Sequence, residues 1–269
     1  VMQEVPVLSL RNRDVALDEA LGGREEGLEH VPEYVREQWE ALSPQQCQSV
    51  LDLSDSYGGP PNKTLTGIFR TNGLARDYEN TLTNICPRVA RLNHSCLPNC
   101  QQSYDEAVGV VRVLASGPIR AGEELSLFYV DVLLPRETRM AQLRDQYGFE
   151  CRCPACATED AVREDRRRTI QAVDSESFDR AAAEPARAVA CIERLLTLYD
   201  EEGLDKLVAR GQACCDAFEL SLRCRDVDAA RHWLARAQLY FSQGEGPTSP
   251  HARGLAELLE DPTKHPSWP

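Results

Sequence analysis

The ten residues RLNHSCLPNC at positions 91–100 suit neither a strand interior nor a helix interior. Pro98 cannot donate a hydrogen bond to a strand ladder, and Asn93 and Asn99 favour turns. Apolar residues precede the stretch at Val89 and follow it near Val110. The pattern therefore predicts a polar loop that is held rigid by the elements around it.

A cluster of cysteines lies further along the chain, where CRCPAC at 151–156 places three thiols within six residues. The chain has 11 cysteines, an odd number, and no secretory pattern at its start, which together favour metal binding in a reducing compartment over disulfides. Zinc prefers four tetrahedral ligands, so a fourth must come from elsewhere. From the residues themselves, Cys96, Cys100 and His94 all compete for that place.

Three segments together resemble a known family. They are NHSCLPN at 93–99, GEELSLFY at 122–129 and YGFECRCPAC at 147–156. This combination is similar to the C-terminal half of a SET domain with its post-SET cysteines, and most of all to SET-and-MYND-type protein-lysine methyltransferases without the MYND finger. The resemblance implies an α+β fold, namely a SET-type β-clip of small sheets with a knotted loop, a zinc-binding post-SET segment and an α-helical C-terminal extension.

The same resemblance assigns roles to single residues. It implies one structural zinc ion, with Cys96 as the fourth ligand in preference to Cys100. It implies S-adenosyl-L-methionine as cofactor and Tyr129 as the catalytic tyrosine that orients the amine or the methyl group. The implied zinc ligands are Cys96, Cys151, Cys153 and Cys156. The implied cofactor-binding residues are Asn72, Asn93, His94, Tyr147 and Phe149. Glu123 and Glu124 receive no role, because adjacent strand residues face opposite ways.

We expect three regions along the chain. Residues 1–149 form the SET domain, with a helical insert at about 15–56, and residues 150–157 form the post-SET zinc knuckle. Residues 158–269 form a helical extension similar to tetratricopeptide hairpins. A Gly-x-Gly hairpin that helps to hold the cofactor in SET domains is missing before Val1, which predicts a fragment, a truncated gene or a degenerate copy.

Hydrophobic periodicity gives the elements of these regions. Strands are predicted over Val1–Leu10, 108–114 and 124–129, and a helix is predicted from Leu134-Pro135 to Tyr147. Charge-dense residues 158–168 indicate a solvated linker or a helix. Apolar stripes at helical spacing predict three more helices, over 189–199, 204–222 and 227–241. The other cysteines are expected to be buried small apolar residues, namely Cys47, Cys86, Cys191, Cys214, Cys215 and Cys224.

The composition narrows the possible partners. A formal net charge of −13 argues against direct nucleic-acid binding and suits a basic partner. No apolar run approaches the length of a membrane span. We expect a protein substrate that presents a lysine, histone or non-histone, in the nucleus or the cytoplasm or both, and a possible partner for the helical repeats.

The first functional hypothesis is methyl transfer from S-adenosylmethionine to a protein lysine ε-amine. The alternative is a non-catalytic SET-derived scaffold or interaction protein that has lost cofactor binding. A third hypothesis, that the zinc knuckle is itself a binding module, is weaker because its cysteines adjoin SET-like motifs.

Overall fold

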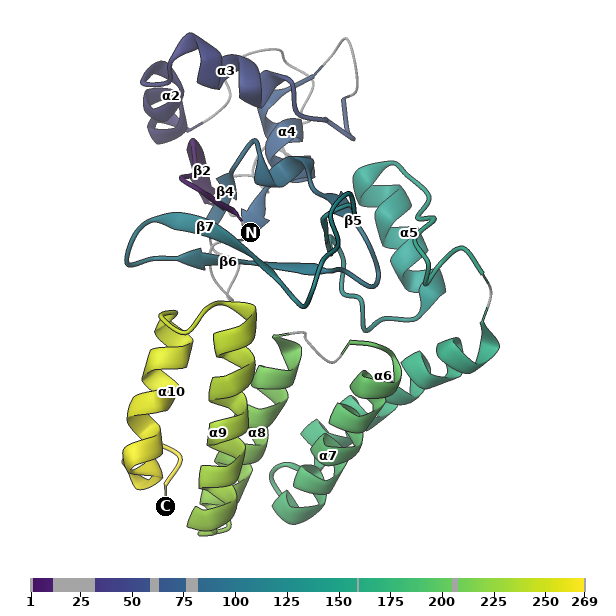
Figure 1. Ribbon diagram of the computed structural model, residues 1–269, viewed down its shortest axis with the longest axis vertical. Coiled ribbons are helices and arrows are strands. Elements are labelled where there is room, and N and C mark those ends of the chain that lie inside the picture. Colours follow the sequence, from purple (N-terminus) through teal and green to yellow (C-terminus); the bar gives the residue numbers. More distant parts are fainter. Residues whose placement is uncertain are drawn as a thin grey trace. The chain divides into compact units, whose positions relative to one another are not determined.

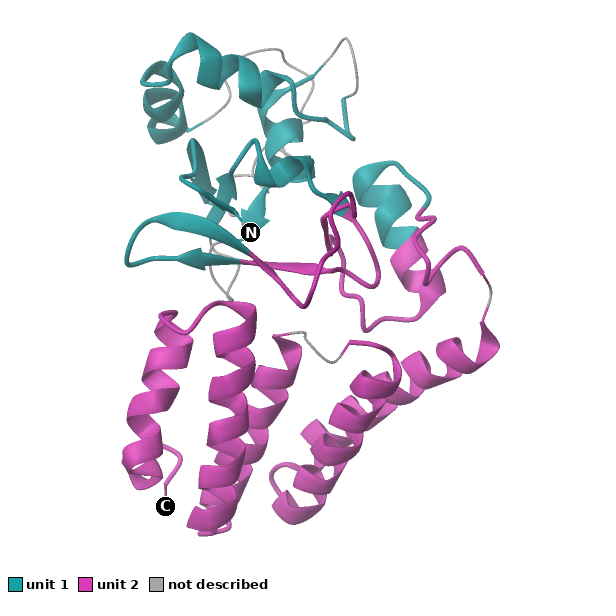
Figure 2. Cartoon of the chain, in the orientation of Figure 1, with its two compact units in different colours: residues 1–93, 103–113, 141–150 teal, residues 94–102, 114–140, 151–269 magenta. Residues whose placement is uncertain are grey.

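The computed structural model describes residues 2–11, 32–58, 63–75, 82–158, 160–204 and 208–268. The chain divides into two compact units that alternate along the sequence (Figure 2). Unit 1 comprises residues 1–93, 103–113 and 141–150, and unit 2 comprises residues 94–102, 114–140 and 151–269. Small antiparallel sheets combined with helices make the chain an α+β protein, as predicted. The predicted boundaries after residues 149 and 157 stay predictions.

Two three-stranded sheets contain most of the strand residues of unit 1. In the first, the order is β1 (Met2–Glu4), β7 (Val110–Ala115) and β6 (Cys100–Asp105). In the second, the order is β2 (Leu8–Arg11), β4 (Leu82–Ile85) and β3 (Leu74–Ala75). The prediction of one strand over Val1–Leu10 is wrong. Pro6 has no N–H for a ladder, and the chain changes sheet around it.

Three of the described helices in unit 1 share a core with the second sheet. They are α2 (Glu33–Glu40), α3 (Pro44–Leu51) and α4 (Leu65–Asn72). Ser43 and Gln46 form a capping box before α3, with Pro44 in the first turn. Val35, Val50 and Ile68 are buried against the strand residues Leu8 and Leu10. Part of the predicted insert, residues 15–31, lies outside the described residues.

A short two-stranded sheet joins β5 (Asn93–His94) to β8 (Ser126–Leu127). The strand predicted over 124–129 is thus reduced to two residues. The reason is visible at Tyr129, whose backbone N–H donates to a ring nitrogen of His94 instead of to a strand. The predicted helix that ends at Tyr147 is confirmed as α5 (Arg136–Tyr147).

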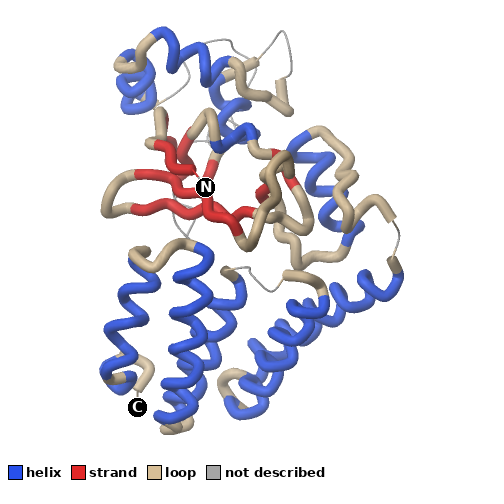
Figure 3. Tube along the Cα trace, in the orientation of Figure 1, coloured by secondary structure: helices blue, strands red, loops and turns tan. Residues whose placement is uncertain are grey.

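A series of helices forms the C-terminal part of unit 2 (Figures 1 and 3). They are α6 (Ala161–Arg180), α7 (Pro185–Glu201), α8 (Ala209–Arg223), α9 (Val227–Gly244) and α10 (Pro250–Glu260). Each packs against the next in the chain, and Ile192, Phe218 and Trp233 lie in their common core. The three predicted stripes correspond to α7, α8 and α9, but α8 begins only at Ala209, so Leu204 and Val208 precede it. Leu207 lies outside the described residues. Among the described helices, none is both long and apolar enough to traverse a bilayer.

The cysteines outside the predicted metal site differ in exposure. Cys86 and Cys214 are buried as predicted, and Cys47, Cys191 and Cys215 are partly buried. The prediction is wrong for Cys224, which is exposed. Cys224 is the C-cap residue of α8 and lies beyond the last buried residue of that helix, Leu222.

Candidate metal centre and the histidine–tyrosine pair

Four cysteine side chains meet in unit 2. Cys96 lies in the loop between β5 and β6, and the other three follow α5. The four Sγ atoms all lie within 4.8 Å of one another, with 3.5 Å between those of Cys96 and Cys156. Four sulfurs bound to one zinc at about 2.3 Å would be separated by about 3.8 Å, so the set fits a tetrahedral zinc ion. The cluster consists of Cys96, Cys151, Cys153 and Cys156.

The backbone around the cluster holds it in shape. The Cys96 N–H donates to the Sγ atom of Cys153 at 3.4 Å. The N–H groups of Cys156 and Ala157 both donate to the carbonyl oxygen of Cys153, which closes the turn that brings the last two cysteines together. Cys100, the competing fourth ligand, instead starts β6 and is not part of the cluster. Four thiolate ligands leave no open position, so a metal here would be structural.

Contacts among the sulfurs shift the pKa values of the four thiols in opposite directions. Their mutual hydrogen bonds raise the pKa of Cys96 and Cys151, and they lower the pKa of Cys153 and Cys156, the last to about 6. A divalent cation would favour the thiolate form at all four positions. The donor set therefore suits a soft, thiophilic metal such as zinc.

His94 connects this cluster to Tyr129. Its Nδ1 atom accepts the backbone N–H of Tyr129 at 3.0 Å, so its Nε2 atom carries the proton that points to the Cys96 Sγ atom at 3.2 Å. Burial is the main cause that lowers the pKa of His94 to about 4, which keeps the imidazole neutral. The rings of His94 and Tyr129 are 5.5 Å apart. Burial raises the pKa of Tyr129, so its hydroxyl stays protonated at neutral pH.

Asn99, for which only a turn was predicted, stabilises the loop that carries these residues. Its Oδ1 atom accepts the backbone N–H of Ser126 at 2.9 Å, and its Nδ2 atom donates to the carbonyl oxygen of Glu124 at 2.9 Å. The same amide donates to the carboxylate of Glu123 at 3.1 Å. The two glutamates of the GEEL segment thus have a structural use in fixing the position of β8.

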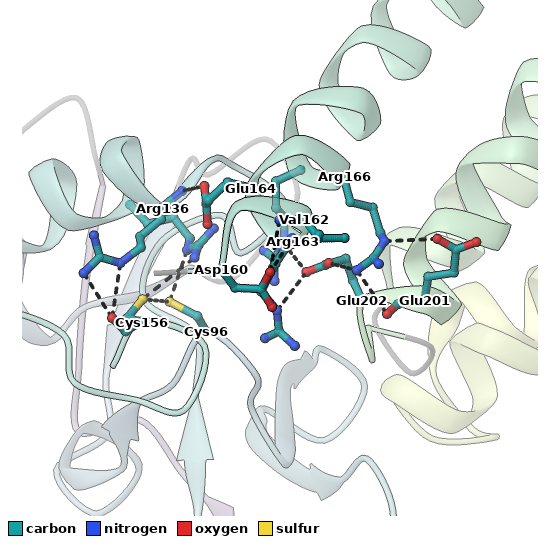
Figure 4. Close-up of polar contacts among 12 residues, drawn as sticks. Cys96, Arg136, Cys156, Asp160, Val162, Arg163, Glu164, Arg166, Glu201 and Glu202 are labelled. Atoms are coloured by element: carbon teal, nitrogen blue, oxygen red, sulfur yellow. Dashed lines mark hydrogen bonds and ion pairs between the residues drawn. The ribbon is translucent and has the colours of Figure 1, made fainter. Parts of the chain in front are cut away.

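Two arginines in the first turn of α5 also contact the cluster, and sequence reasoning missed both. Arg136 donates through Nε and Nη2 to the carbonyl oxygen of Cys156 at 3.2 and 3.1 Å, and its backbone N–H donates to the Glu164 carboxylate at 2.7 Å (Figure 4). Arg139 reaches the sulfurs themselves. A charged residue in an amphipathic helix usually faces water, and no local signal marks these two as partners of the cysteines.

The remaining predicted site residues lie in unit 1. Asn72 ends α4, where its Nδ2 atom donates to the carbonyl oxygens of Ser54 and Ile68 at 2.6 and 2.8 Å. Asn93 is exposed in β5, and Tyr147 and Phe149 lie at the end of α5 and just beyond it. The cofactor-binding role of these residues, and of His94, stays a prediction. His94, Tyr129 and the four cysteines are brought together in unit 2.

Comparison with known proteins shows what part of the chain is similar to. The SET domain family matches residues 8–130. The human N-lysine methyltransferase SMYD2 is 37% identical over 113 residues, which cover 40% of this chain and 26% of the relative. The mouse histone-lysine N-methyltransferase SMYD3 is 46% identical over 74 residues, which cover 28% of this chain and 17% of the relative.

A longer match extends into the helical region. The histone-lysine N-methyltransferase set5 of Schizosaccharomyces pombe is 26% identical over 207 residues, which cover 74% of this chain and 63% of the relative. The chain thus spans less than two thirds of each of these relatives. The match to residues 8–130 includes β5, β8 and the His94–Tyr129 pair. Residues 8–130 are therefore similar to a SET domain, and these relatives with similar segments are named as protein-lysine methyltransferases.

Proposed function

We propose that this chain transfers a methyl group from S-adenosyl-L-methionine to the ε-amine of a lysine in a protein substrate. The observation that carries the proposal is the contact of His94 with both Tyr129 and Cys96, inside the segment that matches the SET domain. The relatives named as lysine methyltransferases support the reaction class, and the two named as histone-lysine methyltransferases make a histone a candidate substrate.

For methyl transfer the protein mainly needs to align the lysine amine with the methyl group and to exclude water from the amine. A sulfonium methyl group supplies the electrophile, and the amine must be neutral to attack it. Free lysine has a pKa of about 10.4, which burial and a nearby positive charge both lower. The Tyr129 hydroxyl, kept protonated by the raised pKa, is assigned to orient the amine or the methyl group. Alignment of this kind supplies much of the reduction in the barrier.

The predicted cofactor contacts belong to the same proposal. We assign Asn72, Asn93, His94, Tyr147 and Phe149 to the binding of S-adenosylmethionine, on the family resemblance of the segments in which they lie. We assign one zinc ion to the four cysteines, where it would hold the segment after α5 against the loop of Cys96. Four closely packed thiols suit a reducing compartment, and we propose the nucleus, the cytoplasm or both.

Two measurements test the function. Titration calorimetry with S-adenosylmethionine is expected to give a binding signal. No heat at about millimolar cofactor would mean a binding free energy weaker than about −4 kcal/mol and would favour the scaffold alternative. Tyr129→Phe is then expected to lower the rate of methyl transfer by up to about 100-fold, or to change the number of methyl groups added, at unchanged zinc content. Tyr57→Phe, which removes a hydroxyl from a tyrosine that is 43% exposed, is the matched control. Unaltered transfer in Tyr129→Phe would remove Tyr129 from its role.

A further inference from the structure

Arg139 is a fully buried charge that contacts the four cysteines. Its side chain is 0% exposed. The Nε atom donates to the Sγ atom of Cys96 at 3.2 Å, and the Nη2 atom lies 3.8 Å from the Sγ atom of Cys156. The Nη1 atom donates to the carbonyl oxygen of Leu134. Every nitrogen of the guanidinium therefore has a partner, and two of the three partners are cysteine sulfurs of the cluster.

The charge of Arg139 has no carboxylate partner within the described residues. The contrast with Arg167 makes this informative. Arg167 is also 0% exposed, but its Nε atom lies 2.7 Å from the Glu202 carboxylate (Figure 4 shows Glu202). A buried cation without a counter-ion is strongly destabilising. The anions available to Arg139 are thus the sulfurs of Cys96 and Cys156.

The charges of a loaded centre complement this arginine. Four thiolates around one divalent cation carry a net charge of −2, and Arg139 would offset half of it at direct contact. Groups that hydrogen-bond to metal ligands orient them and tune the affinity of the metal.

We infer that Arg139 is the charge partner of the four-cysteine centre, and that it strengthens metal retention while the metal in turn stabilises its burial in α5. This inference rests on the zinc site proposed above. The coupling must be reciprocal, because whatever raises the affinity for the metal is favoured to the same extent by metal binding. Arg139 is therefore a positioning residue that links occupancy of the centre to the start of α5.

Competition with a chromophoric chelator measures the zinc dissociation constant in full-length variants. Arg139→Met keeps most of the volume and removes the charge, and it is expected to weaken zinc binding by about 10- to 100-fold. Arg139→Lys keeps the charge and is expected to lose less zinc affinity than Arg139→Met. Arg144→Met is the matched control on the same helix, since the Arg144 side chain is 60% exposed and only pairs with Glu150 at the surface. Substitution by Co²⁺ gives a spectroscopic check, because its absorption reports the number of thiolate ligands.

Urea unfolding of the zinc-free proteins separates charge from packing. If Arg139 acts through charge, zinc-free Arg139→Met is at least as stable as zinc-free wild type. The variant is then less stable than wild type only when zinc is present. Equal destabilisation with and without zinc would show a packing role and overturn the inference. A wild type that takes up no zinc would refute the metal site itself, whereas wild-type affinity in Arg139→Met would refute only the role of Arg139. If Arg139→Met does not fold, Arg139→Lys decides: a loss within about tenfold supports the charge role, and a loss beyond 100-fold overturns it.

Discussion

At the scale of the residue, the Asp55 side chain holds the backbone around it in place. Its carboxylate accepts the backbone N–H groups of Tyr57, Gly58 and Thr64 at 2.8 to 2.9 Å. Burial alone would raise the pKa of Asp55, but the backbone donors, led by Gly58, outweigh burial and lower it. The carboxylate therefore stays charged, and it lies directly against Gly67 in α4.

Gly67→Ala is expected to destabilise the protein. A Cβ atom at this position would lie 2.2 Å from the Asp55 Oδ2 atom, and the Asp55 carboxylate cannot move without breaking its backbone hydrogen bonds. We expect the free energy of unfolding to fall by about 1–3 kcal/mol, as for overpacked interiors. Gly254→Ala in α10 is the control, because nothing lies within 4 Å of its Cβ position and a gain of up to about 1 kcal/mol is expected. Urea unfolding of both decides, and equal stability of the two variants would contradict the expectation.

The residues of the metal centre were predictable from the sequence only in part. Cys151, Cys153 and Cys156 signal a metal site by their spacing, but Cys96 was one of several possible fourth ligands until the family resemblance favoured it. The contacts of Arg139 were not predictable, because they depend on how the first turn of α5 is oriented. Local sequence contains no record of such long-range contacts.

At the scale of the element, helix α6 shows why charge density alone does not predict solvent exposure. Residues 158–168 are dense in charge, which is typical of a solvated surface, and a helix was one of two interpretations. In the structure Arg163, Arg166 and Arg167 of α6 all form ion pairs with Glu202, the C-cap residue of α7. Figure 4 labels Arg163, Arg166 and Glu202. The Glu202 side chain is 0% exposed. Periodicity predicted the helix interiors α7, α8 and α9, but it cannot show which charged faces meet.

Glu202→Ala is expected to be strongly destabilising because it leaves the buried Arg167 without a counter-ion. Loss of one partner of a buried pair costs about 3–5 kcal/mol. Glu201→Ala is the matched control next in the chain: the Glu201 side chain is 53% exposed and pairs with Arg166, so a cost below about 1 kcal/mol is expected. Chemical denaturation followed by circular dichroism measures both, and a similar small cost at the two positions would show that Arg167 finds another partner.

Helix α10 was not predicted, although its start carries recognisable signals in Ser249 and Pro250. The Ser249 hydroxyl caps the helix by accepting the N–H of Ala252. Just inside this start, His251 lies 3.0 Å from the Glu245 carboxylate and stacks on Phe241. The hydrogen bond to Glu245 is the main cause that raises the pKa of His251.

This contact predicts a pH dependence with a definite sign. Because the pKa of His251 is higher in the folded chain than its ordinary value of about 6.5, its contribution to stability is fully present below about pH 6.5 and is lost as pH rises through the folded value. We expect the difference in unfolding free energy between wild type and His251→Gln to be larger at pH 5.5 than at pH 8.5. Urea unfolding at the two pH values measures it. A difference that does not change with pH would mean that Glu245 does not favour the charged imidazole.

At the scale of the whole molecule, the four-cysteine cluster joins segments that are distant in sequence. Cys96 lies 55 or more positions before the other three, and all four belong to unit 2, as do Arg136 and Arg139. The core of unit 1, formed around Leu8, Val50 and Ile68, contains none of these residues. A metal at the cluster would therefore stabilise the two units unequally.

Removal of zinc is expected to loosen unit 2 first. A free zinc concentration of 1,000 times the Kd stabilises a folded state by about 4 kcal/mol. Chelation removes that stabilisation from the segments held by the metal. Hydrogen exchange read by mass spectrometry should show faster exchange after chelation at residues 94–102, 126–140 and 151–157. The peptides of α3 and α4 in unit 1 should keep their protection, because no zinc ligand contributes to their core. Re-addition of zinc is the control for irreversible damage. Faster exchange of equal size in both units would show instead that the metal stabilises one cooperative fold, in which the loop of Cys96 and the helices of unit 1 open together.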